Sequence, residues 1–205
     1  MKKVKFVLLA SVICISQACN SGNNDSVDAA KDANDKKDTT VTTNSMDSLT
    51  NRDTTRTMAA TPVDKSDADF AVEAANGGMM EVEMGNYAQQ NASSSRVKDF
   101  GAMMVRDHSK ANSELKALAA SKNITLPATM GTDAHKEMED LMKKKGKDFD
   151  KAYMNMMLDD HKKDVKAFEK AASNCKDADL KSFASKTLPV LRTHLDSTKA
   201  ITGKN

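Results

Sequence analysis

Four titratable side chains fall on the apolar stripes of four predicted helices, one on each helix. They are Glu81, His108, His161 and His194. A carboxylate or imidazole in an apolar interior must be hydrogen-bonded, neutralised or coordinated. Residues converging from four helices at one level of a bundle can bind iron, zinc or copper. The alternative is that each is a core residue bonded to a carboxylate or carbonyl of the next helix.

His108 and His161 each end one copy of a repeated six-residue motif. Residues 103–108 read Met-Met-Val-Arg-Asp-His, and residues 156–161 read Met-Met-Leu-Asp-Asp-His, with a lysine two residues after each histidine. The repeat favours a helical bundle with related halves. Asp107 and Asp160 precede the histidines and so point about 100° away around the helix. We expect them to be partners of histidines rather than ligands, and we expect His135, off these stripes, to lie on the surface.

The elements that must position these residues are helical. Aromatic residues make up 4% of the chain, and the good helix formers Ala, Met, Lys, Leu and Glu dominate from residue 66 onward. A four-helix bundle with a long crossover connection is therefore predicted for residues 66–202. The expected long helices span about 66–92, 95–121, 148–173 and 177–201, with a short helix at about 133–145 in the crossover.

Methionine is unusually frequent, with 14 in the chain. Thioethers are soft ligands suited to Cu(I), but methionine is also an adaptable filler of helical cores. Because most of these residues lie on or beside the apolar stripes, core packing is the favoured interpretation.

The N-terminus is typical of an exported protein. A basic start and an apolar run over residues 6–15 predict a signal peptide at 1–18. Residues 16–19, Ser-Gln-Ala-Cys, resemble a lipoprotein processing site, which favours lipidation of Cys19 over an ordinary secretory cleavage. Residues 19–65 are so polar that a disordered tether is expected there. These features predict a lipid-anchored protein of the cell envelope, in the periplasm or at the outer membrane, with the lipid as its membrane contact.

Other functional classes find little support. The formal net charge is +2, from 31 basic and 29 acidic residues, so the chain has no excess of basic residues that would indicate nucleic-acid binding. Neither a nucleophilic triad nor a glycine-rich phosphate loop is present, so no enzymatic activity is predicted. With Cys19 lipidated, Cys175 is left unpaired, and it is either a reactive thiol or a thiol half-buried at a helix end.

The chain resembles the bacterial domain-of-unknown-function family 4142. The resemblance rests on the residues in the ranges 69–85, 97–108, 149–161 and 188–194, which include the two Asp-His pairs and Leu-Pro before His194. Members of that family are labelled as outer-membrane or periplasmic proteins and are grouped with the ferritin-like four-helix bundles. The resemblance implies a ferritin-like fold in the cell envelope and no established reaction.

The sequence departs from the di-iron ferritin-like proteins, which place Glu-x-x-His on two helices. The residues three before the histidines are apolar here: Val105, Leu158 and Leu191. A carboxylate-rich ferroxidase centre is therefore not expected. Two functional hypotheses follow. The first is a non-enzymatic structural, interaction or stress-related lipoprotein, with an envelope protein as partner. The alternative is a transition-metal-binding bundle that uses one core ligand per helix.

Overall fold

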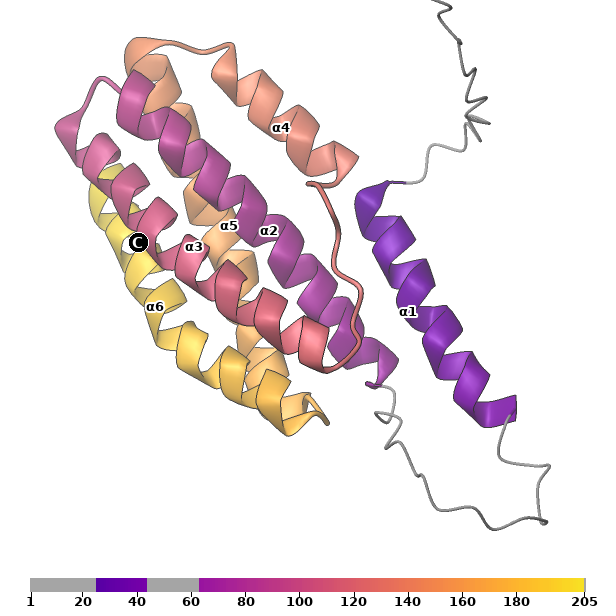
Figure 1. Cartoon of the computed structure of the whole chain (residues 1–205). Helices are drawn as coiled ribbons and strands as arrows, with labels where there is room; N and C mark the ends of the chain where they lie inside the picture. The colour runs from indigo at the N-terminus through magenta and orange to yellow at the C-terminus, as the bar shows by residue number, and fades with distance from the viewer. Residues whose placement is uncertain (1–24, 44–62, 205) are drawn as a thin grey trace, which may run out of the picture.

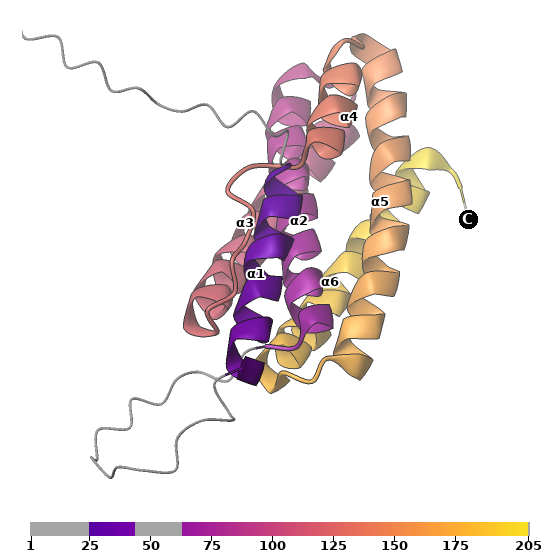
Figure 2. The same cartoon turned by 90° about the vertical axis from the view of Figure 1, so that its right-hand side faces the viewer.

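The computed structural model describes residues 25–43 and 63–204 of the chain, and these residues form six helices and no strand. Figures 1 and 2 show the arrangement from two sides. The helices are α1 (Ser26–Thr43), α2 (Lys65–Asn91), α3 (Ser95–Ser121), α4 (Thr132–Met142), α5 (Gly146–Asn174) and α6 (Ala178–Thr202). The all-helical prediction is confirmed for this part of the chain, with helix ends close to those expected.

The four long helices pack as two hairpins. A short turn at 92–94 joins α2 to α3, and a turn at 175–177 joins α5 to α6; α3 also packs on α6 and α2 on α5. The segment 122–145 crosses between the hairpins and carries α4, which packs on α2 and α5. The core therefore has four sides, and each long helix contributes one face to it.

Local signals explain where the helices begin and end. Asp177 caps α6 by accepting hydrogen bonds from the backbone N–H groups of Asp179 and Leu180, and Gly203 ends it with a φ of 68°. Asp64 caps α2 by accepting a hydrogen bond from the backbone N–H group of Ser66. Gly146 begins α5 with a φ of 59°, a backbone conformation that favours glycine.

Glycines let α2 and α3 approach closely. A methyl group at Gly85 would lie 2.7 Å from the carbonyl oxygen of Gly101, and one at Gly101 would lie 2.8 Å from that of Gly85. Gly78 faces the side chain of Asn112 in the same interface, whereas a methyl group at Gly77 would meet nothing within 4 Å. Close packing of the two helices therefore requires a glycine at Gly78 but not at Gly77.

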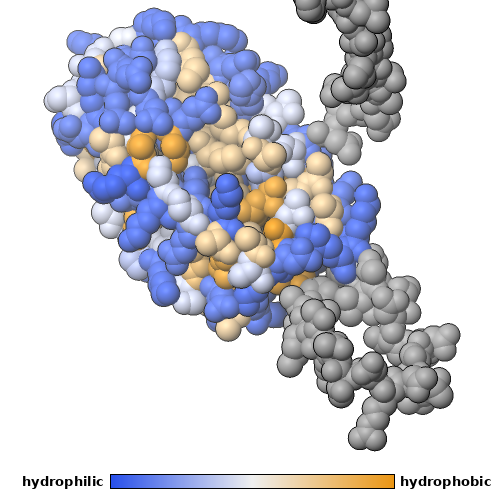
Figure 3. All heavy atoms as spheres, in the orientation of Figure 1, coloured by the Kyte–Doolittle hydropathy of each residue, from blue (hydrophilic) through white to orange (hydrophobic). Residues whose placement is uncertain are grey.

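Two apolar clusters fill the core. One, near the 175–177 turn, includes Leu115, Phe168, Leu180 and Phe183. The other, near the 92–94 turn, is rich in methionine and aromatic residues: Met80, Met84, Met104, Met154, Met157, Phe100, Phe149 and Tyr153. These methionines therefore pack in the core, as expected. Apolar residues also reach the surface in the separate patches of Figure 3, on an otherwise largely hydrophilic face.

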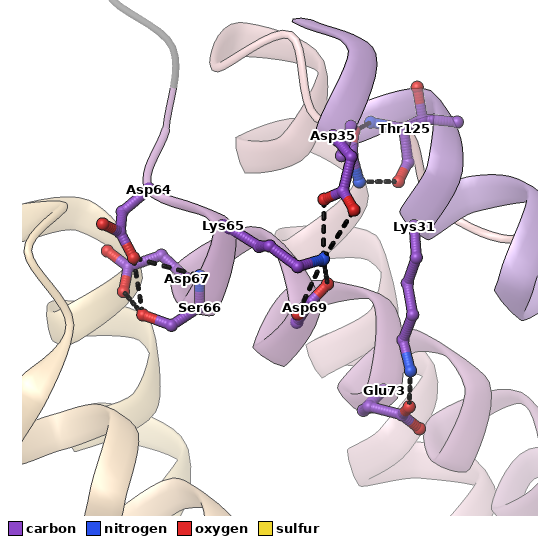
Figure 4. A network of polar contacts seen from close by, with 10 residues as sticks. Lys31, Asp35, Asp64, Lys65, Ser66, Asp67, Asp69, Glu73 and Thr125 are labelled. Carbon is purple, nitrogen blue, oxygen red and sulfur yellow. Dashed lines mark hydrogen bonds and ion pairs between the residues drawn. The ribbon is translucent and has the colours of Figure 1, made fainter. Parts of the chain in front are cut away.

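Residues 26–43 correct the prediction of a disordered tether over residues 19–65, because they form α1 and pack on α2. The side chain of Asn34 binds both backbone groups of Thr125, donating to its carbonyl oxygen over 2.9 Å and accepting from its N–H over 2.7 Å. Lys31 pairs with Glu73, and Lys65 pairs with Asp35 (Figure 4). Polar contacts thus hold α1 against the bundle, because its composition provides few apolar side chains to bury.

The remaining N-terminal predictions, including the signal peptide at 1–18 and lipidation of Cys19, lie outside the described residues. Within the described ranges, no helix combines the length and the apolar character that a membrane span requires.

Candidate metal centre

The four predicted ligands converge between the two apolar clusters. Glu81 lies on α2, His108 on α3, His161 on α5 and His194 on α6, and their exposed fractions are 2%, 6%, 0% and 1%. One ring nitrogen from each histidine lies within 4.8 Å of the other two. In the bundle, α3 and α5 each pack between α2 and α6 and so lie diagonally opposite each other. The two copies of the repeated motif, on α3 and α5, therefore bring their histidines together from opposite sides of the core.

The proton of the His161 ring is fixed by a backbone carbonyl. Nδ1 of His161 lies 2.9 Å from the carbonyl oxygen of Met157, one helical turn earlier. A carbonyl oxygen can only accept, so Nδ1 carries the proton and Nε2 carries a lone pair in the neutral ring. This tautomer, assigned from the hydrogen bond, directs a potential ligand nitrogen toward the centre.

The proton of the His194 ring is fixed by a carboxylate. Nε2 of His194 lies 2.9 Å from Oδ2 of Asp107. Although partial burial opposes it, hydrogen bonds from Arg106 and His194 hold the pKa of Asp107 below its usual value, so this carboxylate is ionised and accepts. Nε2 of His194 therefore donates, and Nδ1 carries the lone pair. Asp107 is a histidine partner, as expected from its position.

The two lone pairs face each other. Nε2 of His161 lies 3.2 Å from Nδ1 of His194, and neither nitrogen carries a proton in the assigned tautomers. Two acceptors at this distance repel unless a cation lies between them. A tetrahedral metal with bonds of about 2.0–2.1 Å separates its nitrogen ligands by about 3.3–3.4 Å, so the observed spacing is close to that of a metal-bound pair.

His108 and Glu81 complete the arrangement. Nδ1 of His108 lies 2.7 Å from Oε2 of Glu81, and Oε1 of Glu81 lies 3.5 Å from Nε2 of His161. Within the described ranges, Nε2 of His108 and Oε1 of Glu81 are buried atoms without a hydrogen-bond partner. Buried polar atoms nearly always have a hydrogen-bond partner. Two unpaired atoms in the same layer are therefore consistent with a binding site for an ion.

Burial sets the charge of the centre. Desolvation lowers the pKa of His108, His161 and His194 to about 4, so the rings are neutral near pH 7, the state in which imidazole binds metals. Desolvation also raises the pKa of Glu81 to about 7, partly offset by His161. The protein therefore holds a largely uncharged, proton-poor set of nitrogen donors beside a carboxyl group.

Asp164 joins the centre although the sequence analysis missed it. One oxygen of Asp164 lies within 4.8 Å of ligand atoms of Glu81 and His161. Burial and the nearby Glu81 raise its pKa well above the usual value. A small cavity of about 20 Å³ touches Glu81, His108 and Asp164, large enough for one water-sized occupant. The available signal was its spacing, since Asp164 lies one helical turn after His161.

The other singled-out residues have clear positions. His135 is exposed on α4 and pairs with Glu139, as predicted for a surface residue. Asp160 is buried and forms an ion pair with Lys163 rather than a contact with a histidine. Cys175 is buried at the end of α5, and burial raises its pKa to about 12, so this thiol is not activated.

The fold and the centre together define an all-helical bundle with a buried cluster of histidine and carboxyl groups. Residues 52–201 match the family described as Domain of unknown function (DUF4142), and the chain belongs to that family. The comparison with curated proteins found no match.

A similar solved structure is the crystal structure of a DUF305 fragment from Deinococcus radiodurans. It has a TM-score of 0.61 and 9% sequence identity, and the match covers 69% of this chain and 98% of that one. At this identity the likeness concerns the helical fold alone.

Proposed function

We propose that this protein binds a transition metal ion through His108, His161 and His194, with Oε1 of Glu81 as a fourth donor. The observation that carries the proposal is the 3.2 Å approach of two unprotonated ring nitrogens in the core. An interaction protein has no need for this arrangement, which costs stability unless a cation joins the two nitrogens. This observation favours the metal-binding alternative over a purely structural role.

The donor set limits the choice of metal. Imidazole nitrogens suit zinc, copper and iron, whereas magnesium and calcium prefer oxygen ligands. Among divalent ions bound by nitrogen donors, affinity rises toward copper and then falls at zinc. The second nitrogen of each ring also donates a hydrogen bond, to Glu81, the Met157 carbonyl or Asp107, and such bonds are the usual support of metal-binding histidines.

The setting of this function is also proposed. We place the bundle among the ferritin-like four-helix proteins, with one ligand per helix in place of paired Glu-x-x-His motifs. The basic and apolar start of the chain and the Ser16–Cys19 motif support export and lipid anchoring in the cell envelope. A role in holding or buffering a metal there agrees with a sequence that carries no catalytic motif.

Elemental analysis of protein purified without chelators or a histidine tag tests the proposal. We expect about one zinc, copper or iron per chain after dialysis against each metal, and loss of that metal in His108→Ala and His161→Ala. His135→Ala is the matched control, because it removes an exposed histidine outside the centre and should leave the metal content unchanged. Folded wild-type protein that takes up none of the three metals would refute the proposal.

A further inference from the structure

A pocket connects the buried centre with the surface. It has a volume of about 360 Å³ and lies between α2, α4 and α5, with Glu81 and Asp164 among its lining residues. Glu81 is almost completely buried, and its Oε1 has no hydrogen-bond partner among the described residues. Asp164 is only partly buried, so it links the centre with the pocket. This side of the centre is therefore reachable from solvent.

Carboxyl groups outnumber basic groups among the residues that line this pocket. Glu73 and Asp160 are each paired with a lysine, Lys31 and Lys163 respectively, as Figure 4 shows for the first pair. Two further carboxylates, on α4, lie exposed at the rim: Asp133 and Glu137. A cleft lined by one sign of charge concentrates ions of the opposite sign and speeds their association. Carboxylate oxygens also suit the exchange of water on a hydrated divalent cation.

We propose that this pocket is the portal through which a hydrated divalent cation reaches the histidine centre. Asp133 and Glu137 attract the cation, and Asp164 binds it at the floor before it passes to His161. This inference rests on the proposed metal-binding function and adds the route and the residues that control it. Lys163, at the wall of the pocket, opposes the approach of a cation.

Stopped-flow mixing of metal-free full-length protein with Co²⁺ tests the portal, because Co²⁺ absorbs visible light when nitrogen donors bind it. Removing both rim charges, in Asp133→Asn with Glu137→Gln, should slow association by about three- to tenfold at low ionic strength. The affinity should change less than about twofold, because dissociation by the same route slows as well. The difference should shrink at 0.5 M salt, where screening is strong. Lys163→Gln should act in the opposite direction and speed association.

Glu139→Gln with Asp140→Asn is the matched control, since it removes two negative charges from the same helix at residues outside the pocket lining. It should leave the association rate unchanged. Equal slowing by the control and the rim variants would overturn the portal, and so would Co²⁺ binding at wild-type rates in the rim variant. Either result leaves the metal site intact. Failure of the wild-type protein to bind Co²⁺ at all would instead overturn both proposals.

Discussion

Replacing His161 by leucine separates the destabilisation that the centre causes without metal from the stabilisation that a bound metal provides. In the metal-free protein, Nε2 of His161 is a buried acceptor facing a second acceptor, Nδ1 of His194, over 3.2 Å. Leucine is similar in size to histidine and removes this conflict while keeping the layer apolar. It also removes the hydrogen bond from Nδ1 to the Met157 carbonyl. Without metal, the variant should therefore be more stable than the wild type. With metal, it should lack the stabilisation that binding gives the wild type.

The magnitude follows from these two opposing contributions. An unsatisfied buried polar atom costs about 1–3 kcal/mol, and a hydrogen bond contributes about 1 kcal/mol. The net gain in the free energy of unfolding of metal-free His161→Leu is about 1 kcal/mol, or about 2–4 °C in Tm for a chain of this size. Metal at 100 times its Kd stabilises the wild type by about 2.7 kcal/mol. The order of stability should therefore reverse, with the wild type ahead by about 2 kcal/mol.

Denaturant unfolding followed by circular dichroism, with and without Zn²⁺, measures both states. The exposed His135→Leu serves as control and should differ from the wild type by less than about 0.5 kcal/mol in either condition. A metal-free His161→Leu protein that is less stable than the wild type by more than about 1 kcal/mol would refute the reasoning. Such a loss would mean that His161 stabilises the core through contacts of its own.

Three further predictions concern the support of the centre, the helix interface and pH. Asp107→Asn should weaken metal binding about 10- to 100-fold in a calorimetric titration with little loss of stability, because it frees the ring of His194 to change tautomer; unchanged affinity would exclude this orienting role. Gly85→Ala should lower the free energy of unfolding by at least about 1 kcal/mol, because the methyl group meets a carbonyl of α3 at 2.7 Å, whereas Gly77→Ala should be neutral or stabilising by up to about 1 kcal/mol. Equal Tm shifts for the two glycine variants would contradict the close-packed interface. Since the folded-state pKa of His161, about 4, lies below the usual 6.5, the unfolded chain binds more protons between these values and stability is lost as the pH falls. The advantage of metal-free His161→Leu should therefore grow by about 3 kcal/mol from pH 7 to pH 4 and level off below it, and a pH-independent gap would show that this histidine is not buried in its neutral form.

Most of the fold was predictable because helical periodicity and end signals are local. Asp177 and Gly203 mark the ends of α6 in the sequence as they do in the structure. Periodicity also placed His108 and His161 on inward faces, and one polar residue per helix was enough to predict that Glu81 would join them. What periodicity leaves open is the rotation and register of each helix, on which the distances between ligand atoms depend.

The parts that escaped prediction depend on contacts between distant segments. The helix α1 is rich in polar residues, and its position depends on partners such as Thr125 and Glu73, far along the chain. Asp164 escaped prediction because the di-iron motif places its carboxylate one turn before each histidine, whereas Asp164 lies one turn after His161. The Asp107–His194 contact joins α3 to α6, and spacing within a single helix does not contain it.

The most direct test of the central claim is a crystal structure of the protein grown with Zn²⁺ and measured at the zinc absorption edge. We expect one strong anomalous peak in the core, about 2.0–2.1 Å from a ring nitrogen of each of His108, His161 and His194. Nε2 of His161 and Nδ1 of His194 should be two of these nitrogens, with their hydrogen bonds to Met157 and Asp107 unchanged. Zinc bound only at surface residues such as His135, with the core histidines in their present contacts, would contradict the claim.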